Sequence, residues 1–184
     1  MSIVASLGGL AALRRLLSGL PAGFPACVLV VMHLEPGRES HLARLLGLGC
    51  ALPVRQARDG ERLAEGVVYV APPDRHLLAA ADGTLFLSDA PPEHHSRPAG
   101  DPLFRSVAEH YGPRAVAVVL TGRLGDGSGG VGDVHAAGGT VLAQDPATAA
   151  AGSMPLASIH TGVVDRVLPL DQIAPALRGL VGAG

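Results

Sequence analysis

The 184-residue chain has no tryptophan, and only 3% of its residues are aromatic. A hydrophobic core must therefore be built from leucine, valine, alanine and isoleucine, and a hydrophobic content of 48% supplies enough of them. Charge is also scarce, since 16% of the residues are charged and the formal net charge is −2. This balance gives no electrostatic reason to expect nucleic acid or an anionic membrane as a partner. The length predicts a single domain over residues 1–184.

Cysteine occurs only as Cys27 and Cys50. Their spacing fits no zinc motif, and so few cysteines indicate a reducing compartment rather than a disulfide framework. No apolar run is long enough to span a membrane, and the N-terminus lacks the charged and then apolar pattern of a signal peptide. We therefore expect a cytoplasmic protein without membrane insertion.

The chain does contain short apolar runs of strand length. These runs are IVA (3–5), CVLVVM (27–32), GVVYVA (66–71), AVAVVL (115–120) and TVLAQ (140–144). Because the longer ones are continuous rather than alternating, they predict strands that are buried on both faces, as in a parallel sheet. A hairpin is predicted where HLLAA and TLFLS flank Ala81-Asp82-Gly83, and a proline-rich loop follows over 89–101.

Segments with helical spacing of leucines or with helix-capping signals lie between the strand candidates. They cover 7–20, 101–112, where Asp101 is a candidate cap before Pro102, and 169–180. Strands that alternate with helices predict the α/β class, with a doubly wound, mainly parallel sheet and flanking helices. We expect a Rossmann-like three-layer sandwich with one β-hairpin.

A polar residue follows the end of three predicted strands. Ser6 follows 3–5, His33 follows 27–32, and Asp126 lies in the loop after the strand that ends at Leu120. Ligands of doubly wound sheets bind beyond these strand ends. If the strands are neighbours, the three side chains converge as nucleophile, base and orienting carboxylate. The simpler interpretations are a helix cap for Ser6, a structural role for His33 and a turn role for Asp126.

The segment GDGSGG (125–130) offers a rival interpretation, because it matches G-x-G-x-x-G and Asp145 follows at a later strand end. Two features disfavour such a dinucleotide site. Four residues separate Leu120 from the first glycine, and Asp126 would place a negative charge beside the pyrophosphate. A calcium loop that starts at Asp126 fails at its twelfth position, which is Ala137.

The remaining histidines give no metal signature. His94 and His95 are adjacent in the proline-rich loop without a third ligand at a suitable spacing, so we expect them to be solvated. The others are expected to be surface or capping residues: His41, His76, His110, His135 and His160. We predict no metal site and no cofactor.

Several long segments occur in a characteristic order along nearly the whole chain. They are ASLGG, VVMHLEPG, DGERLAEGVVYVAPPDRHL, RPAGDPLFRSVA, AVAVVLTGRLGDG and AQDPATAAAGSMPLASIHTGVVDRVLPL. Together they resemble the catalytic domain of the CheB-type protein-glutamate methylesterases of bacterial chemotaxis. The resemblance implies hydrolysis of glutamate γ-methyl esters on the cytoplasmic part of methyl-accepting chemoreceptors, often with glutamine deamidation. It also implies that Ser6 is the nucleophile, His33 the general base and Asp126 the orienting carboxylate.

In this interpretation the backbone N–H groups after Ser6 face the oxyanion, and the glycines Gly8 and Gly9 let a protein substrate approach the backbone. Around this site the chain departs from the family pattern. Val4 and Leu7 replace small residues beside Ser6, and Arg123 replaces a methionine. A cation at 123 can attract an acidic substrate, pair with Asp126 or obstruct the pocket.

Two further departures lie in the loops, where Leu124 replaces a glycine and Ser96 replaces the histidine of an H-R-P-S motif. Chemotactic members of the family also carry an N-terminal receiver domain, for which these residues leave no room. We therefore expect either that the domain stands alone, or that a receiver-type regulator is a separate chain or was removed. Three alternatives stay open. They are a catalytically weakened signalling module, an esterase with another substrate, and the dinucleotide binder.

Overall fold

The computed structural model describes residues 1–34 and 40–182. Within these residues the main sheet has seven strands in the order β3-β4-β2-β1-β7-β8-β9, and all neighbouring strands are parallel. The strands are β1 (Ser2–Ala5), β2 (Val28–Met32), β3 (Val54–Gln56), β4 (Val68–Val70), β7 (Val116–Val119), β8 (Thr140–Gln144) and β9 (Arg166–Leu168). A separate antiparallel hairpin pairs β5 (His76–Ala79) with β6 (Leu85–Ser88). The predicted fold class and its hairpin are confirmed.

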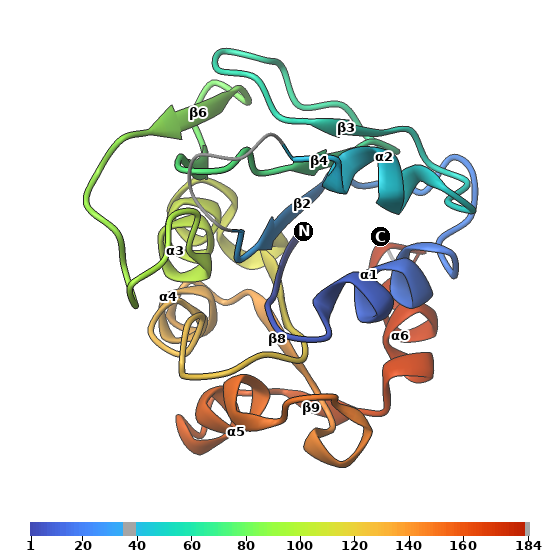
Figure 1. Cartoon of the computed structure of the whole chain (residues 1–184), viewed down its shortest axis with the longest axis vertical. Helices are drawn as coiled ribbons and strands as arrows, with labels where there is room; N and C mark the ends of the chain where they lie inside the picture. Colours follow the sequence, from blue (N-terminus) through green and yellow to red (C-terminus); the bar gives the residue numbers. More distant parts are fainter. Residues whose placement is uncertain (35–39, 183–184) are drawn as a thin grey trace.

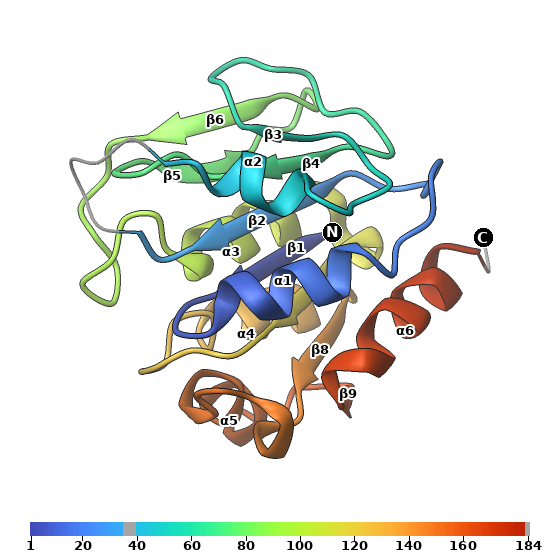
Figure 2. The ribbon, with the colours of Figure 1, turned by 45° about the vertical axis from the view of Figure 1, so that its right-hand side comes forward.

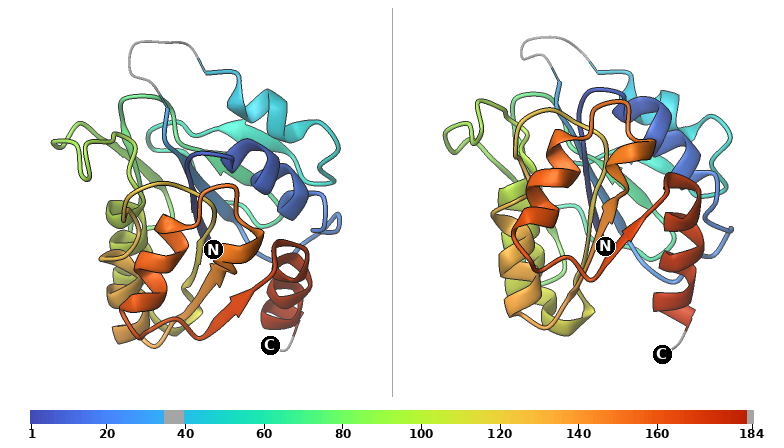
Figure 3. Two further views of the ribbon diagram at one scale, coloured as in Figure 1. Left: turned by 60° about the horizontal axis from the view of Figure 1, so that its bottom comes forward. Right: turned by 90° about the horizontal axis from the view of Figure 1, so that it is seen from below.

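Helices cover both faces of this sheet (Figures 1 and 2). The helices are α1 (Gly9–Leu17), α2 (Leu42–Gly47), α3 (Gly100–Tyr111), α4 (Gly130–Ala136), α5 (Ser153–His160) and α6 (Leu170–Gly182), with short 3₁₀ turns at Gly112–Arg114 and Pro146–Thr148. One layer contains α1, α2 and α6, and the other contains α3, α4 and the hairpin. The right-hand view of Figure 3, from below, shows the sheet between α3 and α4 on one side and α1 and α6 on the other.

Alternation along the central strand β1 joins the two layers. Ile3 and Ala5 pack into the cluster that includes α1 and α6, whereas Val4 packs into the cluster that includes Phe104 of α3. The side chain of Ser6 follows at the end of this strand, at the point where the chain order of the sheet reverses. In an open α/β sheet this is where ligands bind.

Two helix boundaries differ from the prediction. The first helix begins at Gly9 instead of residue 7, because Gly8 adopts a left-handed conformation with φ of 79°. The third helix begins at Gly100, so Asp101 lies inside the first turn and is not its N-cap. As a result, Gly8 precedes the first turn of α1, and Asp101 lies within the first turn of α3. No helix in the described ranges is long and apolar enough to cross a membrane.

Candidate active site

The three predicted site residues follow three adjacent strands, β2, β1 and β7. Ala5 pairs with Met32 in the parallel register of β1 and β2, so Ser6 and His33 leave the sheet side by side. The N–H of His33 donates to the carbonyl of Ala5 over 3.2 Å, which holds the two strand ends together. Parallel pairing thus brings together residues that lie far apart in the sequence.

His33 and Asp126 form a direct hydrogen bond. Nε2 of His33 lies 2.6 Å from Oδ2 of Asp126, the carboxylate is fully buried, and the imidazole is one-fifth exposed. Asp126 does lie in a turn, in which the N–H of Ser128 donates to the carbonyl of Gly125 over 3.1 Å, but its side chain is buried and hydrogen-bonded as well. An ionised Asp126 accepts the proton of Nε2, so the neutral imidazole keeps Nδ1 as its basic nitrogen.

The N-terminus of α3 holds the Asp126 carboxylate in place. The N–H of Gly100 donates to Oδ2 over 2.6 Å, and that of Asp101 donates to Oδ1 over 3.1 Å. Burial by itself raises the pKa of this carboxyl, but the hydrogen bonds from His33 and the two backbone N–H groups outweigh it. The pKa of Asp126 therefore lies below its ordinary value, and Asp126 is ionised at neutral pH.

The serine side of the site is more open. The hydroxyl of Ser6 has no hydrogen bond within the described ranges, and its carbonyl, not its side chain, accepts from the N–H of Gly9 over 2.7 Å. The helix-cap interpretation of Ser6 is therefore wrong. The N–H groups of Leu7 and Gly8 likewise find no acceptor among the residues that the structure describes.

Thr121, which follows β7, fixes the turn after Ser6. Its hydroxyl donates to the carbonyl of Leu7 and accepts from the N–H of Ala151, both over 2.9 Å. Its own N–H donates to the side chain of Gln144 over 2.9 Å. Thr121 and Gln144 were not predicted as site residues, although each is a polar residue at the end of an apolar strand, which is the signal that identified Ser6.

The glycines beside Ser6 serve close packing. A Cβ on Gly8 would lie 2.6 Å from Cβ of Ala150, and one on Gly9 would lie 2.8 Å from Cβ of Ala5. A Cβ on Gly122 would overlap the sulfur of Met154 and lie 2.9 Å from Cβ of Ser6. These contacts are internal, so the glycines are needed for packing whatever the approach of a substrate.

Arg123 and Leu124 project from the loop between Gly122 and Asp126. Both are exposed, and Leu124 is 67% exposed with φ of 66°. Arg123 forms no ion pair or hydrogen bond with another described residue. The hydrogen-bond partners of the Asp126 carboxylate in the described ranges are His33, Gly100 and Asp101. The pairing of Arg123 with Asp126 that we considered from the sequence is not present.

The glycine string 125–130 packs α4 against α3. The N–H of Gly130 at the start of α4 donates over 2.7 Å to Oδ1 of Asp101, which occupies the place that a pyrophosphate would take in a dinucleotide site. A Cβ on Gly130 would lie 2.6 Å from Cβ of Phe104. Asp145 caps a 3₁₀ turn through the N–H of Ala147. These contacts argue against the dinucleotide interpretation.

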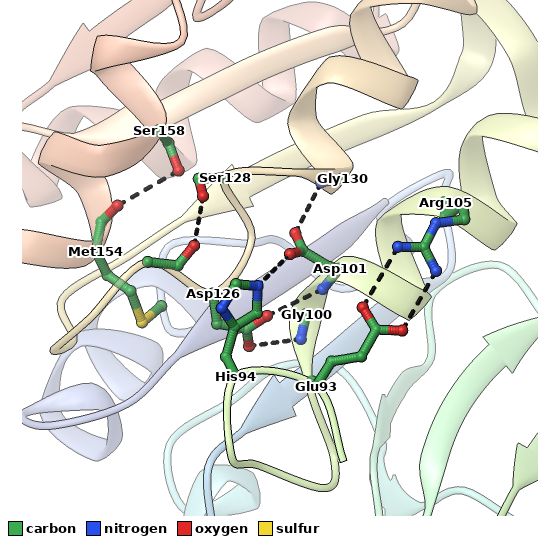
Figure 4. A network of polar contacts seen from close by, with 12 residues as sticks. Glu93, His94, Gly100, Asp101, Arg105, Asp126, Ser128, Gly130, Met154 and Ser158 are labelled. Atoms are coloured by element: carbon green, nitrogen blue, oxygen red, sulfur yellow. Dashed lines mark hydrogen bonds and ion pairs between the residues drawn. The ribbon is translucent and has the colours of Figure 1, made fainter. Parts of the chain in front are cut away.

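His94 is not the purely solvated residue that we expected. Its Nε2 lies 2.6 Å from Oδ2 of Asp101 (Figure 4). Candidate ligand atoms of His94, Asp101 and Asp126 lie within 4.8 Å of one another. All four carboxylate oxygens of Asp101 and Asp126, however, accept from N–H donors, so the cluster is a hydrogen-bond network.

His76 also differs from the expected surface role. It is 1% exposed, Nδ1 accepts from the N–H of Ala99 over 3.2 Å, and Nε2 lies 3.1 Å from the carbonyl of Pro91. It therefore ties the two ends of the proline-rich loop to the hairpin. Of the other histidines, His41, His135 and His160 are exposed and His110 is half-buried.

Comparison with known proteins places this geometry in a family. The family model "CheB methylesterase" matches residues 1–177. A protein-glutamate methylesterase/protein-glutamine glutaminase 3 of Anaeromyxobacter dehalogenans is 49% identical over 96% of this chain and 52% of its own length. A namesake in Salmonella typhimurium is 37% identical over 100% of this chain and 53% of its own length.

A solved structure agrees with these sequence relatives. The crystal structure of the Thermotoga maritima CheB methylesterase catalytic domain superposes with a TM-score of 0.94 at 39% identity and covers 98% of this chain and 97% of that domain. The chain spans about half the length of the curated relatives that it matches. On the family match and this superposition, the chain belongs to the CheB methylesterase family.

Proposed function

We propose that this domain hydrolyses γ-methyl esters of glutamate in methyl-accepting chemoreceptors, and that it deamidates glutamine at the same sites. The relatives' names support the reaction class. The observation that carries the proposal is the 2.6 Å hydrogen bond between His33 and the buried Asp126, beside Ser6 at the neighbouring strand end. A serine, an imidazole and a buried carboxylate on adjacent strands form a nucleophile, base and orienter set.

The reaction is acyl transfer through Ser6. Nδ1 of His33 takes the hydroxyl proton as the serine oxygen attacks the ester carbonyl, and Asp126 stabilises the imidazolium that forms. Collapse of the tetrahedral intermediate breaks the bond to methoxide, which receives the proton from His33 and leaves as methanol. A water molecule, activated by the same imidazole, then hydrolyses the acyl-enzyme and releases the glutamate carboxylate.

The backbone after Ser6 is suited to hold the oxyanion. The N–H groups of Leu7 and Gly8 have no described acceptor, and Thr121 holds the carbonyl of Leu7. Fixed donors of this kind stabilise the charge that develops in the transition state. In the proposed mechanism, these two N–H groups therefore stabilise the negative charge of the oxyanion.

A shallow groove leads to this position and supports a substrate of protein size. It has a volume of about 490 Å³ and is lined by Ser6, Leu7, Gly8, Gly9, Leu10, Ala11, Arg14 and Met32. Because the groove is open and mostly apolar, with one guanidinium at its edge, it suits a side chain presented on a protein surface. A receptor helix that carries a methylated glutamate fits this description.

The decisive experiment measures methanol release from a methylated chemoreceptor fragment. We expect Ser6→Ala to lower the rate on the order of a thousandfold, because the proposed mechanism requires the Ser6 hydroxyl as its nucleophile. Ser18→Ala, at the C-cap of α1, is the matched control and should retain the full rate. Methanol release by Ser6→Ala at the rate of the unmodified domain would overturn the assignment. Absence of turnover in the unmodified domain would favour a non-catalytic signalling module.

The variant Arg123→Met, assayed in the same way, tests whether Arg123 attracts an acidic substrate or obstructs the pocket. Since Arg123 does not contact Asp126, we expect kcat to stay within about twofold and KM for an acidic receptor fragment to rise about two- to threefold. The rise in KM should shrink at high salt, because exposed charges are screened. A large increase in kcat would contradict this expectation and show that Arg123 obstructs the pocket.

A further inference from the structure

The Asp126 carboxylate is held by the first turn of α3 instead of by its own loop. Gly100 and Asp101 supply the two backbone N–H groups that bind its oxygens, at 2.6 Å and 3.1 Å. Oδ2 is shared between Gly100 and His33, so a shift of this turn moves the carboxylate relative to the imidazole. The position of α3 therefore sets the geometry of the catalytic pair.

A second imidazole–carboxylate pair fixes this turn of α3. The buried side chain of Asp101 accepts from His94 at Oδ2 over 2.6 Å and from the N–H of Gly130 at Oδ1 over 2.7 Å (Figure 4). Asp101 thus joins the loop before α3 to the first turn of α4. Because each carboxylate oxygen of Asp101 binds a different segment, the side chain and the backbone attached to it have little freedom to rotate.

The loop is built to present His94 in this position. Glu93 and Ser96 exchange two backbone hydrogen bonds of 3.1 Å and 2.9 Å, and His94 between them has φ of 50°. Glu93 also pairs with Arg105 of α3. The neighbouring His95 shares the positive φ, 62°, but forms no hydrogen bond or ion pair with a described residue.

Repulsion between two buried carboxylates is a second reason why His94 matters for this turn. The carboxylates of Asp101 and Asp126 are both buried and close together, and two like charges in such a site repel. The donors from His94, His33 and the starts of α3 and α4 offset this repulsion. Without His94, the hydrogen-bond donor that the described residues leave to the Asp101 carboxylate is the N–H of Gly130, with the Arg105 guanidinium as a nearby charge. The repulsion between the two carboxylates would then act on the turn that holds Asp126.

We propose that His94 is a positioning residue for the hydrolytic reaction. Through Asp101 it fixes the first turn of α3, whose N–H groups hold Asp126 against His33. The inference rests on the proposed function for its effect on rate, but the geometry of the His33–Asp126 pair can be measured without substrate.

The test uses three variants of the intact domain. His94→Asn tolerates the left-handed backbone but is too short to reach Asp101, whereas the amide nitrogen of His94→Gln extends to about the place of Nε2. His95→Asn is the matched control at a positive-φ histidine of the same loop. We expect kcat for methanol release to fall about tenfold in His94→Asn with KM unchanged, to recover largely in His94→Gln, and to remain unchanged in His95→Asn.

A substrate-free measurement separates positioning from simple loss of stability. The 2.6 Å hydrogen bond to Asp126 should shift the ¹H resonance of the His33 Nε2–H downfield. This resonance should move upfield in His94→Asn and keep its position in His94→Gln and His95→Asn, at temperatures well below each melting transition. Equal kcat and equal resonance positions in His94→Asn and His95→Asn would overturn the proposal, as would a glutamine variant no better than the asparagine variant. If the unmodified domain releases no methanol, the proposed function fails and the resonance alone decides this inference.

Discussion

The two sides of the candidate active site, which we call the base side (His33, Asp126) and the nucleophile side (Ser6) after their proposed roles, are built differently. On the base side, every carboxylate oxygen of Asp126 and Asp101 accepts a hydrogen bond, and both side chains are buried. On the nucleophile side, the Ser6 hydroxyl and the N–H groups of Leu7 and Gly8 lack described partners, and Leu7 is 50% exposed. The base side is thus arranged before substrate arrives, whereas the donors of the nucleophile side remain available to it.

Asp126→Asn breaks the base side and should have the largest effect. The amide offers one acceptor oxygen where the carboxylate has two, so its NH₂ group faces either His33 and the N–H of Gly100 or the N–H of Asp101, and it carries no negative charge. We expect kcat to fall on the order of a thousandfold or more, because the imidazolium of His33 loses the negative charge that stabilises it. Methanol release measures it, and a loss smaller than about tenfold would contradict the role of Asp126.

The difference in stability between the unmodified domain and Asp126→Asn should depend on pH. Because the folded pKa of Asp126 lies below the ordinary value of 3.8, the ionised carboxylate stabilises the fold above that pH. This contribution is lost as the pH falls through the folded pKa. Thermal unfolding should therefore show a stability gap between the unmodified domain and Asp126→Asn at neutral pH, and this gap should narrow below pH 3.8. A gap that widens in acid would contradict the assigned shift.

Gly122→Ala disturbs the nucleophile side. The new Cβ would overlap the buried Met154 sulfur and lie 2.9 Å from Cβ of Ser6, so either side chain must move. We expect a loss of about 1–3 kcal/mol in the free energy of unfolding and a kcat reduced about tenfold. Gly132→Ala in α4 is the control, since nothing lies within 4 Å of its Cβ, and it should be neutral or slightly stabilising. Equal melting temperatures for the two variants would contradict the packing argument.

The positions of Ser6 and His33 at adjacent strand ends were predictable for one physical reason. Continuous apolar runs identify buried parallel strands, and parallel strands bring their carboxyl ends to one edge of the sheet. Ser6 and His33 are therefore predictable from local patterns alone. The edge strands β3 and β9 were not predicted, because VRQ and RVL are three residues long, contain polar side chains and depend on their neighbours for pairing.

The network behind Asp126 could not be predicted in the same way. It depends on how closely α3 approaches α4 and on the left-handed backbone at His94. In the sequence, Asp101 followed by Pro102 has the pattern of an ordinary cap, and two histidines in a proline-rich loop have the pattern of solvated side chains. Their partners are set by tertiary contacts, which local propensity does not encode.

Leu124→Gly gives the smallest effect and tests whether the loop or α3 holds Asp126. A leucine at φ of 66° costs about 1–2 kcal/mol, whereas glycine adopts this backbone freely but has more entropy to lose on folding. Because Leu124 is 67% exposed, little burial is lost, and we expect a net stabilisation of about 0.5 kcal/mol and a melting temperature about 1–2 °C higher. Leu124→Ala keeps the strain and should melt with the unmodified domain. Since α3 holds the carboxylate, kcat should be the same in both variants. A fall in kcat confined to the glycine variant would instead mean that the stiffness of this loop positions Asp126 for His33.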